Sequence, residues 1–470
     1  MLRTVIGATL VQLGCGVVNG FISVLATLDT AFYANPLDGR TLHAYYVAMG
    51  VFALGVVVVG VAYPKLPPAR WVGLGAALVA LGYGLTAIGV HTTSTALVLL
   101  GYGVIHGLGL GLCYGASFAT AFQRCHDCYL GLCGGLLAAA FGVGSIVGSK
   151  ALLPATTSIG RSSAFLVVGG GVTAVLLLGS ACFYWAPPTT SLDAPKPDDD
   201  EPLTPKAPFS PSTTLSPPVL LEVEEPSAPS LWSSPLVSLD YAALLLLVFG
   251  YVVYGVTMLP RYPLLLLTVF GQSRDAATRI IVTFGLYSIL GRLLGGGLAD
   301  VLSRCIAPPF ARKLLLVTAL LVQVLLLYKL PETLRTRDLD SFEGFVRGLN
   351  VCFGVGFGIF PSFAHVLFGA PAFAKAYSGV VLAWVAALLI GGLSFGASLE
   401  ARYFVQRQPI VQVYDAIFAW LRVLTLVGLV AGILVRTNPH DRFATGVKYQ
   451  VSVCGRPLLR CGVSKPDPMV

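Results

Sequence analysis

The segment Gly107-Leu-Gly-Leu-Gly111 recurs 247 residues further along the chain as Gly354-Val-Gly-Phe-Gly358. Both segments lie in long apolar stretches, near residues 97–121 and 345–368. One interpretation is that two glycine-rich stretches align by chance. The identical spacing in the corresponding stretch of each half instead favours two related halves, the pattern of many transporters.

Similar apolar stretches fill nearly the whole chain, six before residue 186 and six after residue 238. Each approaches the ~20 residues that an α-helix needs to cross about 30 Å of hydrocarbon. We therefore predict an all-α membrane protein of twelve transmembrane helices in two pseudo-symmetric six-helix halves, residues 1–185 and 239–435. The expected spans are 5–27, 43–63, 72–90, 97–121, 129–152, 163–185, 239–262, 279–302, 312–330, 345–368, 374–398 and 415–435.

The composition supports a membrane protein and argues against other classes. Of the 470 residues, 56% are hydrophobic and only 11% are charged, whereas about a quarter of a soluble domain is charged. The net charge of +8 comes from basic residues scattered at span ends, which argues against nucleic-acid binding. The 53 glycines suit close helix packing in lipid, and the ten cysteines form no disulfide framework. No cofactor or enzymatic activity is expected.

Two polar segments lie outside the predicted spans. Residues 186–238 are rich in Pro and Ser and carry an acidic cluster at 198–201, which predicts a disordered loop that could recruit cytoplasmic partners. Residues 436–470 form a mildly basic tail. An even number of spans places both termini on one side, and the distribution of Lys and Arg favours the cytoplasm. We expect the plasma membrane in preference to an organelle.

Arg292 lies near the middle of the span predicted at 279–302. A charge at that depth costs at least ~2.5–3.5 kcal/mol. Its guanidinium is a planar fork of donors that fits a carboxylate, so we predict that Arg292 binds an anionic substrate. The alternative is a structural arginine paired with helix carbonyls.

Asp300 and Arg304 stand at the end of the same span, beside a basic loop, and predict a gate or latch between helices. His106, Tyr114 and Trp384 lie within spans and are assigned to the substrate cavity. The alternative for His106 is a hydrogen bond between helices, and for the two aromatic residues simple packing.

Two further sets of residues are given no role in substrate binding. Cys125-His-Asp-Cys128 provides one half of a zinc-ligand spacing without a second pair, so no metal site is expected. Lys150, Arg347 and Arg422 are interpreted as anchors that extend to the membrane interface from span ends.

Several motifs together resemble the major facilitator superfamily, in the branch that contains oxalate:formate antiporter-like and monocarboxylate transporter-like proteins. The segment Gly296 to Arg304 is similar to the superfamily's short Gly-x-x-x-Asp-x-x-x-Arg signature, with Ser303 where Gly is usual. The other matching segments are Gly107 to Tyr114, Phe141-Gly-x-Gly144, Gly354 to Pro361, Phe368-Gly369 and Tyr377-Ser-Gly379.

The resemblance implies a secondary transporter that works by alternating access, as an antiporter or a symporter, with Arg292 on the substrate carboxylate. Oxalate exchangers of this branch carry a lysine in the eleventh helix, which the segment Val380 to Trp384 lacks. One cation fits a monocarboxylate such as pyruvate, lactate or formate. Ser288 replaces the aspartate linked to proton cotransport. The alternatives are a dicarboxylate or other anion exchanger, or a non-transporting membrane sensor.

Overall fold

The computed structural model describes residues 1–35, 39–184, 238–442, 447–453 and 456–463. Within them, twelve helices are long enough and apolar enough to cross a membrane. This confirms the predicted all-α architecture of twelve spans. The predicted loop at 186–238 lies outside the described residues, apart from Ser238.

The first six spans are continuous helical segments that change helix type in places. Spans 1 and 4 contain a 3-10 segment at Val17–Val24 and a π-helical segment at Leu99–His106. The α-helices are α1 (Leu2–Gly16) and α2 (Leu25–Tyr33) in span 1, α3 (Leu42–Ala62), α4 (Pro68–His91), α5 (Thr95–Val98) and α6 (Gly107–Arg124) in span 4, α7 (Leu130–Ser158) and α8 (Arg161–Tyr184).

The second six spans follow the same order. Span 7 is divided between two helices and span 11 ends in a short π-helical segment. The α-helices are α9 (Leu239–Met258) and α10 (Tyr262–Thr268) in span 7, α11 (Arg274–Leu302), α12 (Pro308–Thr336), α13 (Leu339–Phe368), α14 (Ala370–Leu399) and α15 (Ile410–Leu434).

Most helices begin several residues before the apolar stretch that predicted them. The side chain of Ser273 accepts a hydrogen bond from the backbone of Ala276 at the start of α11. Asp338 does the same for Ser341 at the start of α13, and Pro308 occupies the first position of α12. These are favoured helix-start residues, so the helices extend into the polar caps.

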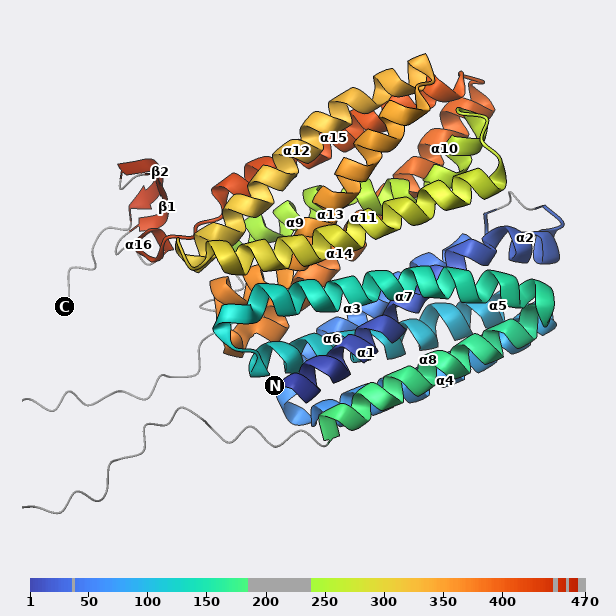
Figure 1. The fold of residues 1–470 in the computed structure, drawn as a ribbon, viewed down its shortest axis with the longest axis horizontal. Helices are drawn as coiled ribbons and strands as arrows, with labels where there is room; N and C mark the ends of the chain where they lie inside the picture. Colours follow the sequence, from blue (N-terminus) through green and yellow to red (C-terminus); the bar gives the residue numbers. More distant parts are fainter. Residues whose placement is uncertain (36–38, 185–237, 443–446, 454–455, 464–470) are drawn as a thin grey trace, which may run out of the picture.

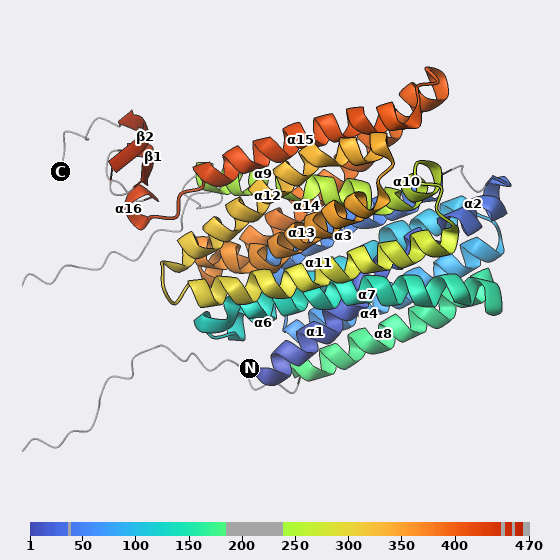
Figure 2. The same cartoon turned by 45° about the horizontal axis from the view of Figure 1, so that its top comes forward.

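The two halves lie side by side in Figure 1, with α1 to α8 in one and α9 to α15 in the other. Met1, the end of α8 and the start of α9 lie at one end of the bundle, called here the termini end. The other end, where α2 and α10 lie, is the opposite end. The halves meet chiefly where α7 packs on α11 and α13 and where α3 packs on α14, and Figure 2 shows α7 beside α11.

The repeated glycines are points of close helix contact in both halves. A Cβ atom on Gly111 would lie 2.2 Å from the Phe52 carbonyl oxygen in α3. A Cβ on Gly358 would lie 2.2 Å from the Arg292 carbonyl oxygen in α11. Within a membrane, small residues such as glycine allow the backbones of neighbouring helices to pack closely. The glycine triplets therefore hold span 4 to span 2 and span 10 to span 8.

The region after α15 is more ordered than the tail that we predicted. It contains α16 (Pro439–Arg442) and an antiparallel pair of strands, β1 (Val447–Val453) and β2 (Arg456–Val463). Arg436 pairs with Asp240 at 2.7 Å, which ties this region to the start of α9. Although burial raises the pKa of Asp441, hydrogen bonds from Ser452 and Gln450 lower it overall and hold β1 to α16.

Replacing Gly111 by alanine is expected to destabilise the protein by about 1–3 kcal/mol, because a Cβ atom there would overlap backbone that cannot move aside. The matched control is Gly170→Ala in α8, where nothing lies within 4 Å of the added atom. Thermal unfolding of the purified protein in detergent measures the difference. Equal melting temperatures for both variants would contradict the packing role.

Candidate functional site

Arg292 lies in the middle of α11 and is only 8% exposed. Its Nη1 donates a hydrogen bond of 2.5 Å to the Ala138 carbonyl oxygen in α7, across the contact between the halves. The guanidinium carbon lies 5.2 Å from the ring centroid of Phe357 in α13. The charge is therefore held at the junction of the two halves, over an aromatic face.

The remaining donors of this guanidinium have no acceptor within the part of the chain that the structure describes. Nε is buried without a hydrogen-bond partner, and the hydrogen bond to Ala138 involves Nη1 alone. Pairing with helix carbonyls, the structural alternative to substrate binding, thus accounts only for the Nη1 group of the guanidinium. The edge formed by Nε and Nη2 is the edge that binds a carboxylate side-on.

Glycines in α7 make room for Arg292. A Cβ on Gly142 would lie 2.8 Å from the Arg292 Nη1, and one on Gly135 would lie 2.6 Å from the Arg292 carbonyl oxygen. Any larger residue at these two positions would push against α11. The predicted motif Phe141-Gly-x-Gly144 thus lies directly beside the arginine.

Seven aromatic residues, among them the Phe357 that lies beside Arg292, form a cluster built from both halves. Trp384 lies at its centre, with ring centroids 5.3 Å from Phe357 and 5.9 Å from Phe52. The hydroxyls of Tyr114 and Tyr377 are 3.0 Å apart and hydrogen-bond across the halves. The aromatic cluster consists of Phe52, Tyr114, Phe118, Phe141, Phe357, Tyr377 and Trp384.

The structure brings together three of the residues assigned to the substrate cavity, namely Arg292, Tyr114 and Trp384. Phe357 and Tyr377 were not singled out, although both belong to quoted motifs, the second glycine triplet and Tyr377-Ser-Gly379. Their place in spans 10 and 11, opposite Tyr114, depends on how the halves pack, which the sequence pattern does not give.

His106 lies elsewhere. It is 1% exposed, and its ring stacks on Tyr102 at 4.4 Å and meets Tyr83 edge-on at 4.8 Å. These residues belong to spans 3 and 4 of the first half, and none of them is in the aromatic cluster. Neither ring nitrogen has a hydrogen-bond partner among the described residues. The surroundings are those of a packed ring.

Asp300 joins the halves at the termini end. Its two carboxylate oxygens accept hydrogen bonds from the backbone N–H groups of Gly131 and Leu132, at 2.8 and 2.7 Å. These groups open α7, where unpaired N–H groups and the helix dipole favour a negative charge. Arg312 of α12 pairs with the same carboxylate at 3.2 Å.

Arg304, which we predicted as the basic member of this gate, is exposed and makes no ion pair with the described residues. Arg312 takes that position instead, and it also donates to Ser362 and Ser303, each at 3.0 Å. Arg312 could have been proposed from the sequence because it is a charged residue at the predicted start of span 9.

Aromatic contacts close the same end between spans 4 and 11. The rings of Phe122 and Phe373 stack with centroids 4.6 Å apart, and His365 lies against both at 5.8 and 5.5 Å. A Cβ on Gly60 of α3 would lie 2.9 Å from the Ser378 side chain in α14. The termini end is thus shut by contacts from both halves.

Comparison with solved structures shows the fold. The proton:xylose symporter XylE, bound to 6-bromo-6-deoxy-D-glucose, superposes with a TM-score of 0.69 at 14% identity, over 93% of this chain and 96% of that one. A bacterial homologue of the iron transporter ferroportin, in its outward-facing state, gives 0.62 at 13% identity, over 92% and 98%.

Sequence comparison shows the family. Apicoplast pyruvate carrier 1 of Toxoplasma gondii is 34% identical over 120 residues, which span 25% of this chain and 21% of that protein. The sequence profile of the Major Facilitator Superfamily matches residues 4–397, most of the chain. The chain therefore belongs to the major facilitator superfamily, and the solved structures that it resembles are transporters and not enzymes.

Proposed function

We propose that this protein carries small organic anions across its membrane, of the monocarboxylate class that includes pyruvate, lactate and formate, with Arg292 binding the substrate carboxylate. The observation that carries the proposal is the edge of the Arg292 guanidinium that has no acceptor among the described residues. A buried charge with unsatisfied donors is costly. A carboxylate on this edge would remove the cost by accepting two hydrogen bonds.

The surroundings of Arg292 favour a small anion with one charge. Among the described residues, Arg292 is the one cation over a ring of the aromatic cluster, so a second carboxylate would lack a partner there. The cluster presents apolar faces together with the Tyr114 and Tyr377 hydroxyls, which suits a short apolar chain with a keto or hydroxyl group. The partial similarity to a pyruvate carrier supports the same class.

Alternating access requires the contacts at the termini end to break and re-form. We assign the gating role there to Asp300 with Arg312, because Asp300 binds both the start of α7 and the second half. The Tyr114 to Tyr377 hydrogen bond also joins the two halves and would break as they separate. His106 has no direct part in binding in this account.

Arg292→Gln is expected to abolish anion uptake, because losing a charge-assisted pair in a low-dielectric site costs on the order of 2–5 kcal/mol, or roughly 30- to several-thousand-fold in affinity. Arg292→Lys keeps the charge without the planar fork and should reduce uptake strongly while the protein still folds. Uptake of labelled pyruvate, lactate, formate and oxalate into proteoliposomes, normalised to folded protein, is the measurement.

The matched control is Arg279→Gln, an exposed arginine in the same helix, which should transport normally. Near-normal uptake by Arg292→Gln would refute the carboxylate role. The account would also be refuted if Arg292→Gln failed to fold while Arg292→Lys folded and transported at the wild-type rate. That result would show that the planar fork is not needed.

Asp300→Asn is expected to loosen the termini end, because the neutral amide loses its attraction to Arg312 and to the N-terminus of α7. The measurement is maleimide labelling of a single cysteine introduced by the nearly isosteric change Ser378→Cys, beside Gly60 at the contact between the halves, in a background without the native cysteines. Labelling should become several-fold faster in Asp300→Asn. Unchanged labelling would contradict the gate, and Asp415→Asn, which removes an ion pair at the opposite end, is the control.

His106→Gln is expected to leave the uptake rate per folded protein, and its profile across about pH 5.5 to 8, as in the wild type. The loss of stacking on Tyr102 should lower the melting temperature instead. A changed pH profile in the folded variant would show that this ring titrates during transport and would contradict the packing role.

A further inference from the structure

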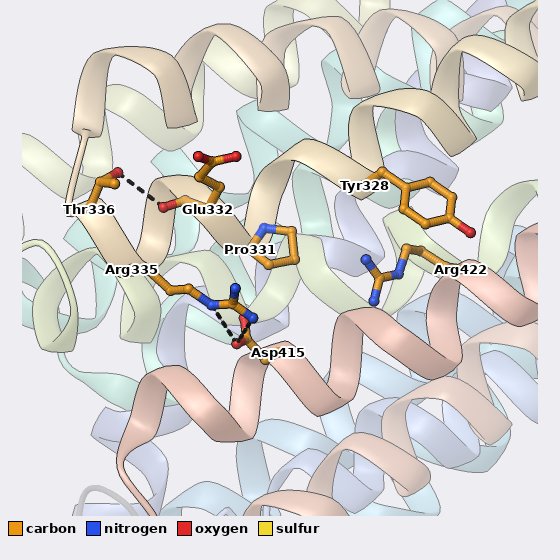
Figure 3. Close-up of a pocket in the computed structure, with 7 residues that line it drawn as sticks. All are labelled: Tyr328, Pro331, Glu332, Arg335, Thr336, Asp415 and Arg422. Carbon is orange, nitrogen blue, oxygen red and sulfur yellow. Dashed lines mark hydrogen bonds and ion pairs between the residues drawn. The ribbon is translucent and has the colours of Figure 1, made fainter.

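A pocket of about 550 Å³ lies between α12 and α15, towards the opposite end of the bundle. Its lining is strongly polar, as Figure 3 shows. The lining residues are Tyr328, Pro331, Glu332, Arg335, Thr336, Asp415 and Arg422.

The pocket opens on the outer surface of the second half. Leu325 of α12 and Val423 of α15 stand beside it in the sequence and are 58% and 59% exposed. Exposed apolar side chains on two neighbouring spans are the surface that faces lipid. A polar pocket in such a surface is accessible to lipid headgroups.

Arg422 lies further from the ends of its helix than we predicted for a residue that anchors a span at the membrane interface. The helix α15 begins at Ile410 and ends at Leu434, so Arg422 lies twelve residues from either end, about 18 Å along the axis. Its side chain lies over the Tyr328 ring at 4.8 Å and makes no ion pair or hydrogen bond with the described residues. A charge in this position is costly unless a partner compensates it.

The charges in the pocket leave one cation and one anion without a partner. Arg335 donates from Nε and Nη2 to Oδ2 of Asp415, at 3.0 and 2.7 Å, so these two charges form an ion pair. The Oδ1 of Asp415 is buried without a partner among the described residues. Glu332 is exposed, and its carboxylate is bonded to none of the described residues. Arg422 and Glu332 therefore remain, one on each helix.

We propose that this pocket binds the headgroup of a phosphatidylethanolamine in the leaflet at the opposite end, with its phosphate on Arg422 and its ammonium on Glu332. The headgroup carries both charges, which matches the one unpaired cation and the one unpaired anion. A guanidinium binds phosphate through charge-assisted hydrogen bonds. A primary ammonium offers three N–H donors to a carboxylate, whereas a choline headgroup offers none.

The order of the charges along the membrane normal also fits this lipid. Glu332 lies four residues before Thr336, the end of α12, whereas Arg422 lies over Tyr328, about one turn of α12 deeper in the membrane. In the lipid, the phosphate lies nearer the acyl chains and the ammonium nearer the water. A lipid with its chains towards the bilayer centre would therefore meet Arg422 with its phosphate and Glu332 with its ammonium.

The test is native mass spectrometry of the purified full-length protein with added phosphatidylethanolamine, phosphatidylcholine or phosphatidylglycerol. The wild type should retain phosphatidylethanolamine about tenfold more tightly than the other two lipids. Arg422→Gln and Glu332→Gln should each remove this preference. Arg161→Gln, an exposed arginine at the same end of the bundle but on α8, should keep it.

Three results would overturn the proposal. Equal retention of phosphatidylglycerol, with no effect of Glu332→Gln, would show a simple anion site. Displacement of the lipid by soluble phosphoethanolamine at equal concentration would show a site for the free compound. Retention of the preference in Glu332→Gln would by itself refute the headgroup orientation. Because Glu332 is exposed, we expect that variant to fold, so the test holds even if Arg422→Gln fails to fold.

Discussion

The buried guanidinium of Arg292 is the constraint around which the two halves are arranged. It lies in α11 of the second half, donates to a carbonyl of α7 in the first half and lies over a ring of α13. Gly142 and Gly135 leave the space that it needs. Because one edge of the fork still lacks an acceptor among the described residues, this close packing leaves the charge incompletely satisfied, as a binding site for an anion requires.

The position of Arg292 also connects binding to conformational change. The carbonyl oxygen of Arg292 lies against Gly135 of α7 and Gly358 of α13. Two turns further along α11, Asp300 joins that helix to the start of α7. Any motion that separates α7 from α11 at the termini end changes the hydrogen bond between Arg292 and Ala138. In our proposal, substrate that binds on the free edge would therefore bias the same interface as the proposed gate of Asp300 and Arg312.

The twelve spans and the special place of Arg292 could be predicted because they depend on properties local in sequence, the length of an apolar run and the cost of a charge within it. Helix starts were less predictable, since capping by Ser273 and Asp338 extends helices into polar sequence. The partner of Asp300 was not predictable, because Arg312 pairs with it across a loop, while the nearer Arg304 is exposed and forms no ion pair with the described residues. The strands β1 and β2 were missed because the polar composition of that region indicated a tail.

The most direct test of the central claim compares the binding of pyruvate with that of pyruvamide, its neutral amide, to the purified wild-type protein by titration calorimetry. The two molecules have nearly the same shape and differ in the charge that Arg292 is proposed to recognise. Our account predicts that pyruvate binds at least about 30-fold more tightly, the lower end of what a charge-assisted pair contributes in a low-dielectric site. Equal affinity for the two compounds would contradict it.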